Sequence, residues 1–190
     1  MEAQPATASP LVHRYTLDEF WELPDPNDGS HYELIDGVLY VVPPPGPPHH
    51  MSASRLNAAL AAYCNAHPER CVLFVPRAAI WTGATYLEPD LFLVRPERLE
   101  QMRAGKLGTA DLVVEIMSPG SAVYDRTAKA DTYAALGIQE LWLVDPQDQR
   151  IEQRVLRGTA WQIVGSFGGN APLRAQVFPD LEVTPAQVFS

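Results

Sequence analysis

Lysine is scarce in this sequence: only two of its 14 basic residues are lysines, and the other twelve are arginines. Basic residues as a whole are outnumbered by 23 acidic residues, which gives a formal net charge of -9. Proteins that coat nucleic acid electrostatically are usually basic, so this balance argues against that class. It does not exclude a nuclease, because bound divalent cations and a local cluster of arginines can offset the charge at one site.

Cysteine is also rare, and so are the signals of secretion and membrane insertion. Cys64 and Cys71 are too few for a disulfide framework and lack the spacing of a metal site, so we expect two small buried apolar residues. The N-terminus has no basic region followed by an apolar one, and no apolar run reaches about 18 residues. These absences predict a cytoplasmic protein that does not contact a membrane.

The length of 190 residues and the hydrophobic content of 46% favour one globular domain with a proper core. We expect this domain to cover residues 1–190, with residues 1–12 as a flexible N-terminal segment. Much of the proline lies in "VVPPPGPPHH", residues 41–50. We interpret this stretch as a stiff, extended connection inside the domain.

Hydrophobic periodicity predicts alternating strands and helices. A capping box at Thr16 opens a short helix, and Asp36-Gly37 is the commonest signal of a tight hairpin. A helix over residues 121–136 would end at Gly137 as a left-handed cap. The other expected elements are a helix over residues 51–67, strands over 71–81, 85–94, 111–117 and 139–146, a meander over 150–165 and a helical turn over 184–189. This order predicts an α/β or α+β fold with one mixed sheet, flanked by helices and crossed by the helix over 121–136.

A glutamate stands in the middle of the most apolar strand, "DLVVEIM". An unpaired carboxylate there would be costly or would be forced to take up a proton, so Glu115 needs a partner. A second acid, Asp90, follows Pro89 directly and precedes the apolar run "LFLV". Mg²⁺ usually takes one or two carboxylates together with water and substrate phosphate. We therefore expect Asp90 and Glu115 to share a divalent cation, although an aspartate at a strand entry, taken alone, is more often a turn residue.

The helix after Glu115 carries a third group of polar residues. Asp125, Lys129 and Tyr133 are spaced i, i+4 and i+8, so they share one face. The rarity of lysine suggests that Lys129 is needed as a compact ammonium, with Asp125 holding it charged and aimed. The alternative is an ordinary surface ion pair between Asp125 and Lys129.

With these residues in place, the sequence resembles the Uma-type endonucleases of the PD-(D/E)XK superfamily of restriction-endonuclease-like nucleases. The segments that carry the resemblance are "YELIDGVL", "EPDLFLV", "DLVVEIMSPGS" and "DRTAKADTYAALGIQELWLVDP". The resemblance implies a restriction-endonuclease-like mixed sheet with an N-terminal hairpin and a C-terminal meander. It also implies that Asp90 and Glu115, with the backbone carbonyl of Ile116, bind Mg²⁺ or Mn²⁺.

One feature of the family pattern, the position of the lysine, differs in this chain. The superfamily places its lysine two residues after the second acid, where this sequence has Met117, so Lys129 on the following helix is the matching lysine. Glu33 and His49 also match recurrent family positions. Glu33 is a candidate catalytic residue as a further metal or water ligand, with a polar edge-strand residue as the alternative. Whether His49 and Asp125 belong to the site is left open.

The implied activity is metal-dependent hydrolysis of phosphodiester bonds in nucleic acid, with DNA as the expected substrate. Lys129 would orient the attacking water and stabilise the transition state. A catalytically inactive nuclease-fold module that binds or regulates is the alternative that the acidic composition favours. A glycoside hydrolase using Asp90 and Glu115 as its carboxylate pair is a second alternative, which Lys129 at the site disfavours. The oligomeric state, including a homodimer, is left open.

Overall fold

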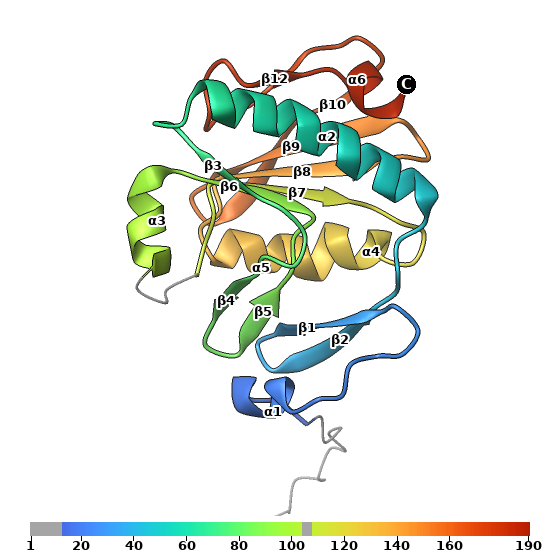
Figure 1. Cartoon of the computed structure of the whole chain (residues 1–190), viewed down its shortest axis with the longest axis vertical. Coiled ribbons are helices and arrows are strands. Elements are labelled where there is room, and N and C mark those ends of the chain that lie inside the picture. The colour runs from blue at the N-terminus through green and yellow to red at the C-terminus, as the bar shows by residue number, and fades with distance from the viewer. Residues whose placement is uncertain (1–12, 104–107) are drawn as a thin grey trace, which may run out of the picture.

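A six-stranded mixed sheet forms the centre of the protein in the computed structural model, which describes residues 13–103 and 108–190 (Figure 1). The strand order is β10-β9-β8-β7-β6-β3, and β7 and β8 are parallel while the other neighbours are antiparallel. The strands are β3 (Val72–Phe74), β6 (Leu91–Val94), β7 (Leu112–Ile116), β8 (Glu140–Asp145), β9 (Arg150–Arg157) and β10 (Ala160–Gly168). The expected mixed sheet with helices around it is confirmed, and so is the closing meander, which is the hairpin β9–β10.

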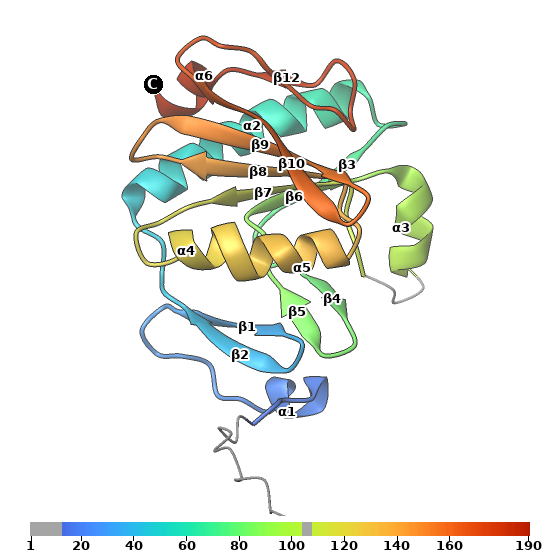
Figure 2. The same ribbon diagram turned by 180° about the vertical axis from the view of Figure 1, so that it is seen from behind.

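Helices cover both faces of this sheet (Figures 1 and 2). On one face lies α2 (Pro47–Ala66), and on the other a continuous helix of three parts crosses from β7 to β8. Side chains of β7 alternate between the two cores: Val114 packs in the α2 core and Val113 in the core under the second helix. Glu115 is two residues from Val113, so the pleat of the strand directs it toward the second helix.

The second helix is not a regular α-helix, although one was expected over residues 121–136. Its parts are α4 (Ala122–Tyr124), the π-helical turn η1 (Asp125–Lys129) and α5 (Ala130–Ala135). Such single π-turns inside helices occur often at functional sites. The expected stop at Gly137 is confirmed, because this residue has φ 75°, which glycine adopts without a steric penalty.

A second sheet of four strands contains the N-terminal hairpin, so the expectation of a single sheet was wrong. Its order is β2-β1-β5-β4, and the hairpin turns at Asp36 and Gly37 as predicted, both with positive φ. The strands are β1 (His31–Ile35), β2 (Val38–Val42), β4 (Ile80–Thr82) and β5 (Thr85–Leu87). The reason is that the strand expected over residues 85–94 is divided: β5 ends before Pro89, β6 begins after it, and the two pair with different partners.

The proline-rich stretch was also predicted incorrectly at its end. Residues 43–46 are extended, but α2 already begins at Pro47, with Gly46 as its N-cap. Proline is well tolerated in the first turn of a helix, because the N–H groups there have no intrahelical partner. His49 therefore lies in the first turn of α2 rather than in a linker.

The two cysteines are buried as expected, but they form a disulfide bond, which was not expected. Cys64 is in the last turns of α2, Cys71 directly precedes β3, and their Cα atoms are 5.6 Å apart. The turn between them reverses the chain, so two residues that are seven apart in sequence meet in space. A Cα separation of this size is typical of disulfides.

The remaining elements lie at the periphery. The capping box of the first helix is confirmed by mutual hydrogen bonds between Thr16 and Glu19. These elements are α1 (Leu17–Trp21), α3 (Pro96–Arg103), which was not expected, β11 (Leu173–Arg174), β12 (Glu182–Val183) and α6 (Pro185–Phe189), the predicted final helical turn. The expected flexible segment 1–12 lies outside the described residues. Within the described ranges, no helix is long and apolar enough to cross a membrane.

Candidate active site

A small pocket of about 50 Å³ brings together most of the residues singled out in the sequence. It lies where the strand ends of the central sheet meet the first turn of α2 and the π-turn η1. The sequence-predicted residues that line it are His49, Asp90, Glu115, Ile116, Asp125 and Lys129. Glu33 lies behind this lining and contacts Lys129.

Asp90 is held by groups from two other elements. It lies one residue before β6, which pairs with β7 in antiparallel register, so its side chain lies beside the end of β7. The N–H of Ile116 donates to Oδ2 of Asp90 at 2.7 Å, and Nε2 of His49 lies 3.0 Å from Oδ1. These contacts fix the rotamer of a carboxylate that is still partly exposed to the pocket.

Glu115 and Lys129 form a buried ion pair with Glu33 and Tyr133 around it. The Lys129 ammonium is 2.8 Å from Oε1 of Glu115 and 3.1 Å from Oε1 of Glu33. The Tyr133 hydroxyl donates to the same Oε1 of Glu115. All four side chains are buried. The lysine that was expected on the helix thus reaches Glu115 on the neighbouring strand.

Glu33 has one oxygen with partners and one without. Besides Lys129, its Oε1 accepts the backbone N–H of Glu88 at 2.8 Å. Its Oε2 is buried, and none of the described residues offers it a hydrogen bond. A buried carboxylate oxygen without a donor is unfavourable, and a bound water or cation would satisfy it.

Burial and neighbouring charges shift the pKa values of these groups in different directions. Burial raises the pKa of Glu115 well above its usual value; Lys129 opposes this effect, whereas Asp125 and Asp90 add to it. Burial is the largest single effect on Glu33 and acts to raise its pKa, but Lys129, His31 and the backbone N–H of Glu88 together outweigh it, so the pKa falls below its usual value. Burial lowers the pKa of Lys129, yet Glu115 and Glu33 more than compensate and the pKa is well above normal. Lys129 is therefore an ammonium at neutral pH.

Asp125 lines the pocket but is not the ion-pair partner of Lys129 that its spacing suggested. Lys129 pairs with Glu33 and Glu115 instead, and neither Asp125 nor Lys129 is a surface residue. Burial raises the pKa of Asp125 to about 6, against the opposing effects of Lys129 and Ser121. Asp125 therefore adds negative charge to the pocket at neutral pH, and no cation among the described residues forms an ion pair with it.

The donor set of the pocket fits a hard divalent cation that is completed by water and substrate. Four acids (Glu33, Asp90, Glu115 and Asp125) surround one ammonium, which leaves an excess of negative charge. Among the residues that the structure describes, no three His, Cys, Asp or Glu side chains are arranged to hold a metal by themselves. Mg²⁺ does not require this, because it usually keeps several waters and binds one or two carboxylates.

Sequence reasoning did not assign roles to several neighbours of these acids. The sequence indicated the contact of Tyr133 with Glu115 only indirectly, because Tyr133 was expected on the same helix face as Lys129. The sequence did not indicate that Pro43 lines the pocket. Pro43 packs against Gly120, where a Cβ would lie 2.8 Å from Cγ of Pro43. Glycine at this position therefore allows the close approach of the β2–α2 connection to the loop after β7.

Comparisons with known proteins agree with the resemblance seen in the sequence. The model of the Uma2 family, described as "Putative restriction endonuclease", matches residues 17–186. A solved structure described as "a putative nuclease belonging to DUF820", from Anabaena variabilis, matches with a TM-score of 0.75 and 21% identity. The match covers 92% of this chain and 97% of that chain, and at this identity it shows a shared fold. No curated protein matches the chain.

Proposed function

The chain belongs to the Uma2 family, and on that premise we propose that it is a metal-dependent nuclease that hydrolyses phosphodiester bonds, with DNA as its substrate. The observation that carries the proposal is the meeting of Asp90, Glu115 and Lys129 in one small pocket with excess negative charge. Two acids from neighbouring strands and one ammonium are the groups that such a reaction needs.

Asp90 and Glu115, with the carbonyl of Ile116, are the groups that would hold Mg²⁺ or Mn²⁺. When bound, such an ion lowers the pKa of a coordinated water and neutralises charge on the phosphate. The protein contributes the orientation of its carboxylates: the Ile116 N–H and His49 fix Asp90, while Tyr133 and Lys129 fix Glu115. The raised pKa of Glu115 is consistent with this role, because a cation would stabilise its ionised form.

Lys129 is placed to act on water or on a phosphate oxygen. An ammonium has three N–H donors, and the contacts with Glu33 and Glu115 account for two. Because Lys129 lines the pocket, the third donor is available to a reacting group there. Glu33 is then a positioning residue: it keeps Lys129 charged and holds it near Glu115.

The direct test is a nuclease assay on single-stranded and duplex DNA and RNA with Mg²⁺, with Mn²⁺ and with EDTA. We expect cleavage with either ion and none with EDTA. In parallel, either ion should raise the melting temperature, because a ligand of the native state stabilises it by about 2.7 kcal/mol at a concentration of 100 Kd.

Glu115→Gln is the variant that tests the site, with Glu69→Gln at an exposed carboxylate outside the pocket as its control. Glu115→Gln should abolish both cleavage and the metal-induced rise in melting temperature, whereas Glu69→Gln should keep both. Metal binding without cleavage of any nucleic acid would favour the non-catalytic module. An unchanged metal response in Glu115→Gln would remove Glu115 from the site.

The place and assembly of the protein belong to the same proposal. A cytoplasmic location is inferred from the sequence, but the Cys64–Cys71 disulfide weighs against it, because disulfides are rare in reducing compartments. A homodimer is compatible with a nuclease that cuts duplex DNA, and measurement of the molar mass in solution would decide it.

A further inference from the structure

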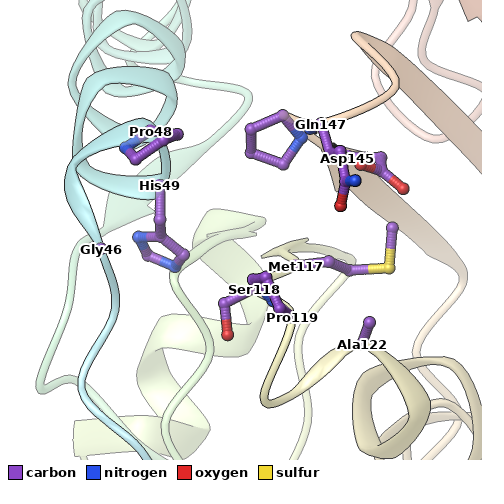
Figure 3. A pocket seen from close by; sticks show the side chains of 10 residues that line it. Gly46, Pro48, His49, Met117, Ser118, Pro119, Ala122, Asp145 and Gln147 are labelled. Atoms are coloured by element: carbon purple, nitrogen blue, oxygen red, sulfur yellow. Dashed lines mark hydrogen bonds between the residues drawn. The ribbon is translucent and has the colours of Figure 1, made fainter.

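A second pocket of about 340 Å³ opens directly beside the candidate active site. It shares His49 and Ser118 with the small pocket, so the two pockets adjoin. A substrate bound in the candidate active site would therefore lie next to this second pocket. Figure 3 shows Pro48 and His49 of α2 on one side, Asp145 and Gln147 on the other, and Met117 with Ala122 below. Ligand pockets usually measure about 300–1,000 Å³, so this one suits a small ring system.

The chemistry of this lining disfavours phosphate and favours a flat heterocycle. The apolar part consists of Pro48, Met117, Pro119, Ala122 and Pro146. Its acidic group, Asp145, carries a negative charge that would repel a phosphate. Oδ1 of Asp145 accepts two backbone N–H groups of the following turn, and the Arg126 guanidinium is 3.8 Å from Oδ2. Gln147 is exposed at the rim and carries both a donor and an acceptor.

We propose that this pocket binds an unpaired nucleobase next to the scissile phosphate, and that the substrate is therefore single-stranded or locally unpaired nucleic acid. This inference rests on the proposed nuclease function. A base in a duplex is stacked and paired, so it must leave the helix to enter a side pocket. Pro48, Met117 and Pro146 would contact the faces of the base, and Gln147 would read its edge.

The test measures binding apart from cleavage, with Ca²⁺ replacing Mg²⁺ and the oligonucleotide checked for integrity afterwards. Three probes are compared by fluorescence anisotropy: a mixed-sequence single strand, its duplex, and the same strand with its central bases replaced by abasic residues. Stacking of one base on an aromatic side chain contributes about 1–3 kcal/mol, and contact with prolines and a methionine should lie at the low end of this range. The intact strand should therefore bind roughly 10-fold more tightly than the abasic strand. The duplex should also bind more weakly than the intact single strand.

Ala122→Phe fills the pocket without altering any acid or the lysine of the site. It should lower the affinity for the intact strand to that of the abasic strand. The matched control is Val123→Phe, one residue further along the helix, where the side chain is 78% exposed. This control should bind all three probes like the wild type. If Ala122→Phe does not fold, Gln147→Ala replaces it and should change the order of affinity among the four homopolymer strands.

The outcomes separate this inference from the proposed function. Equal affinity for intact and abasic strands, with cleavage retained, would overturn the base pocket and leave the nuclease proposal standing. Affinity for the duplex equal to that for the single strand would overturn the single-stranded substrate class. If the wild type neither binds nor cleaves any nucleic acid, the proposed function fails and this inference fails with it.

Discussion

Two buried glutamates on neighbouring parallel strands, Glu115 on β7 and Glu140 on β8, have very different surroundings. Glu140 accepts four hydrogen bonds, all from neutral groups. Its donors are Nε1 of Trp142 at 2.7 Å, Nε2 of Gln153 at 2.6 Å, and the backbone N–H groups of Gln176 at 2.7 Å and Val177 at 2.9 Å. Glu115 instead shares one oxygen between Lys129 and Tyr133, with Asp90, Asp125 and Glu33 close enough to repel it. Glu140 ties the C-terminal segment to the sheet, whereas the surroundings of Glu115 leave a need for positive charge.

The difference shows that a buried glutamate in an apolar strand does not by itself indicate a metal ligand. Glu140, like Glu115, is an acid in an apolar strand and needs a partner. Neutral hydrogen-bond donors satisfy Glu140. Glu115 differs from Glu140 because other acidic side chains lie close to it in a pocket. The following variants test this contrast.

Replacing Lys129 by methionine should have the largest effect. It leaves Glu33, whose pKa Lys129 helps to lower, buried without a countercharge, and removing one partner of a buried ion pair typically costs about 3–5 kcal/mol. We expect this loss in urea denaturation at pH 8 with EDTA, and a smaller loss at low pH, where the carboxylates take up protons. Turnover should fall by roughly 10²-fold or more, as for other preorganised donors.

Arg126→Met is the control for Lys129→Met. Arg126 also pairs with two carboxylates, Asp145 and Glu152, but it is half-exposed, so its loss should cost at most about 1 kcal/mol. Equal losses in the two variants would contradict the account of Lys129 as the charge that holds the site together. Lys129→Arg should restore little activity, because a planar guanidinium does not replace a compact ammonium.

Glu140→Gln should have the next largest effect. The new NH₂ group would replace an acceptor either of Trp142 and Gln153 or of the backbone N–H groups of Gln176 and Val177. Leaving a buried group unsatisfied costs about 1–3 kcal/mol. The same change at Glu115 should alter the stability of the metal-free protein much less, because burial already favours its neutral form. Chemical denaturation of both variants in EDTA measures the contrast, and similar losses in the two would remove it.

Asp125→Asn should have an effect of the opposite sign, a gain of stability that depends on pH. The pKa of Asp125 is raised from 3.8 to about 6 in the folded state, so the folded protein binds a proton more readily than the unfolded chain. The unfolding free energy of the wild type should therefore fall as the pH rises from about 4 to 6. At 1.36 kcal/mol for each pKa unit, the total fall is about 2–3 kcal/mol.

The asparagine variant removes this fall, so in EDTA it should be the more stable protein at pH 7 and equal to the wild type near pH 4. Asp131→Asn, at an exposed position on the same helix, is the control and should follow the wild type at every pH. A wild-type pH profile that is already flat between pH 4 and 6 would contradict the raised pKa of Asp125.

Local sequence patterns predicted most elements of the fold but not how the strands are divided between sheets. The capping box at Thr16, the Asp36-Gly37 turn and the Gly137 cap depend on neighbouring residues only, and all three were predicted correctly. The division of the chain at Pro89 between two sheets depends on which distant strands pair. Periodicity carries no information on such pairing.

The residues of the candidate site were likewise predicted from local patterns, whereas their contacts over long sequence distances were not. Asp90, Glu115 and Lys129 were selected because each breaks a local pattern, and the structure brings them together; their roles stay predictions. The ion pair of Lys129 with Glu33 joins residues 96 positions apart, which no local spacing reveals. Helical spacing predicted a pair of Lys129 with Asp125 because it assumed a regular α-helix, and η1 is not one.

The widened turn η1 has an evolutionary consequence. A π-turn holds one residue more than an α-turn, so this helix is one residue longer in sequence than a regular helix between the same ends would be. Lys129 is the last residue of that turn, and it supplies the ammonium that the wider superfamily is expected to place at the position of Met117. We therefore expect the two traits to covary among relatives. Chains with a lysine at the position of Met117 should lack the extra residue, and their helices should run as unbroken α-helices.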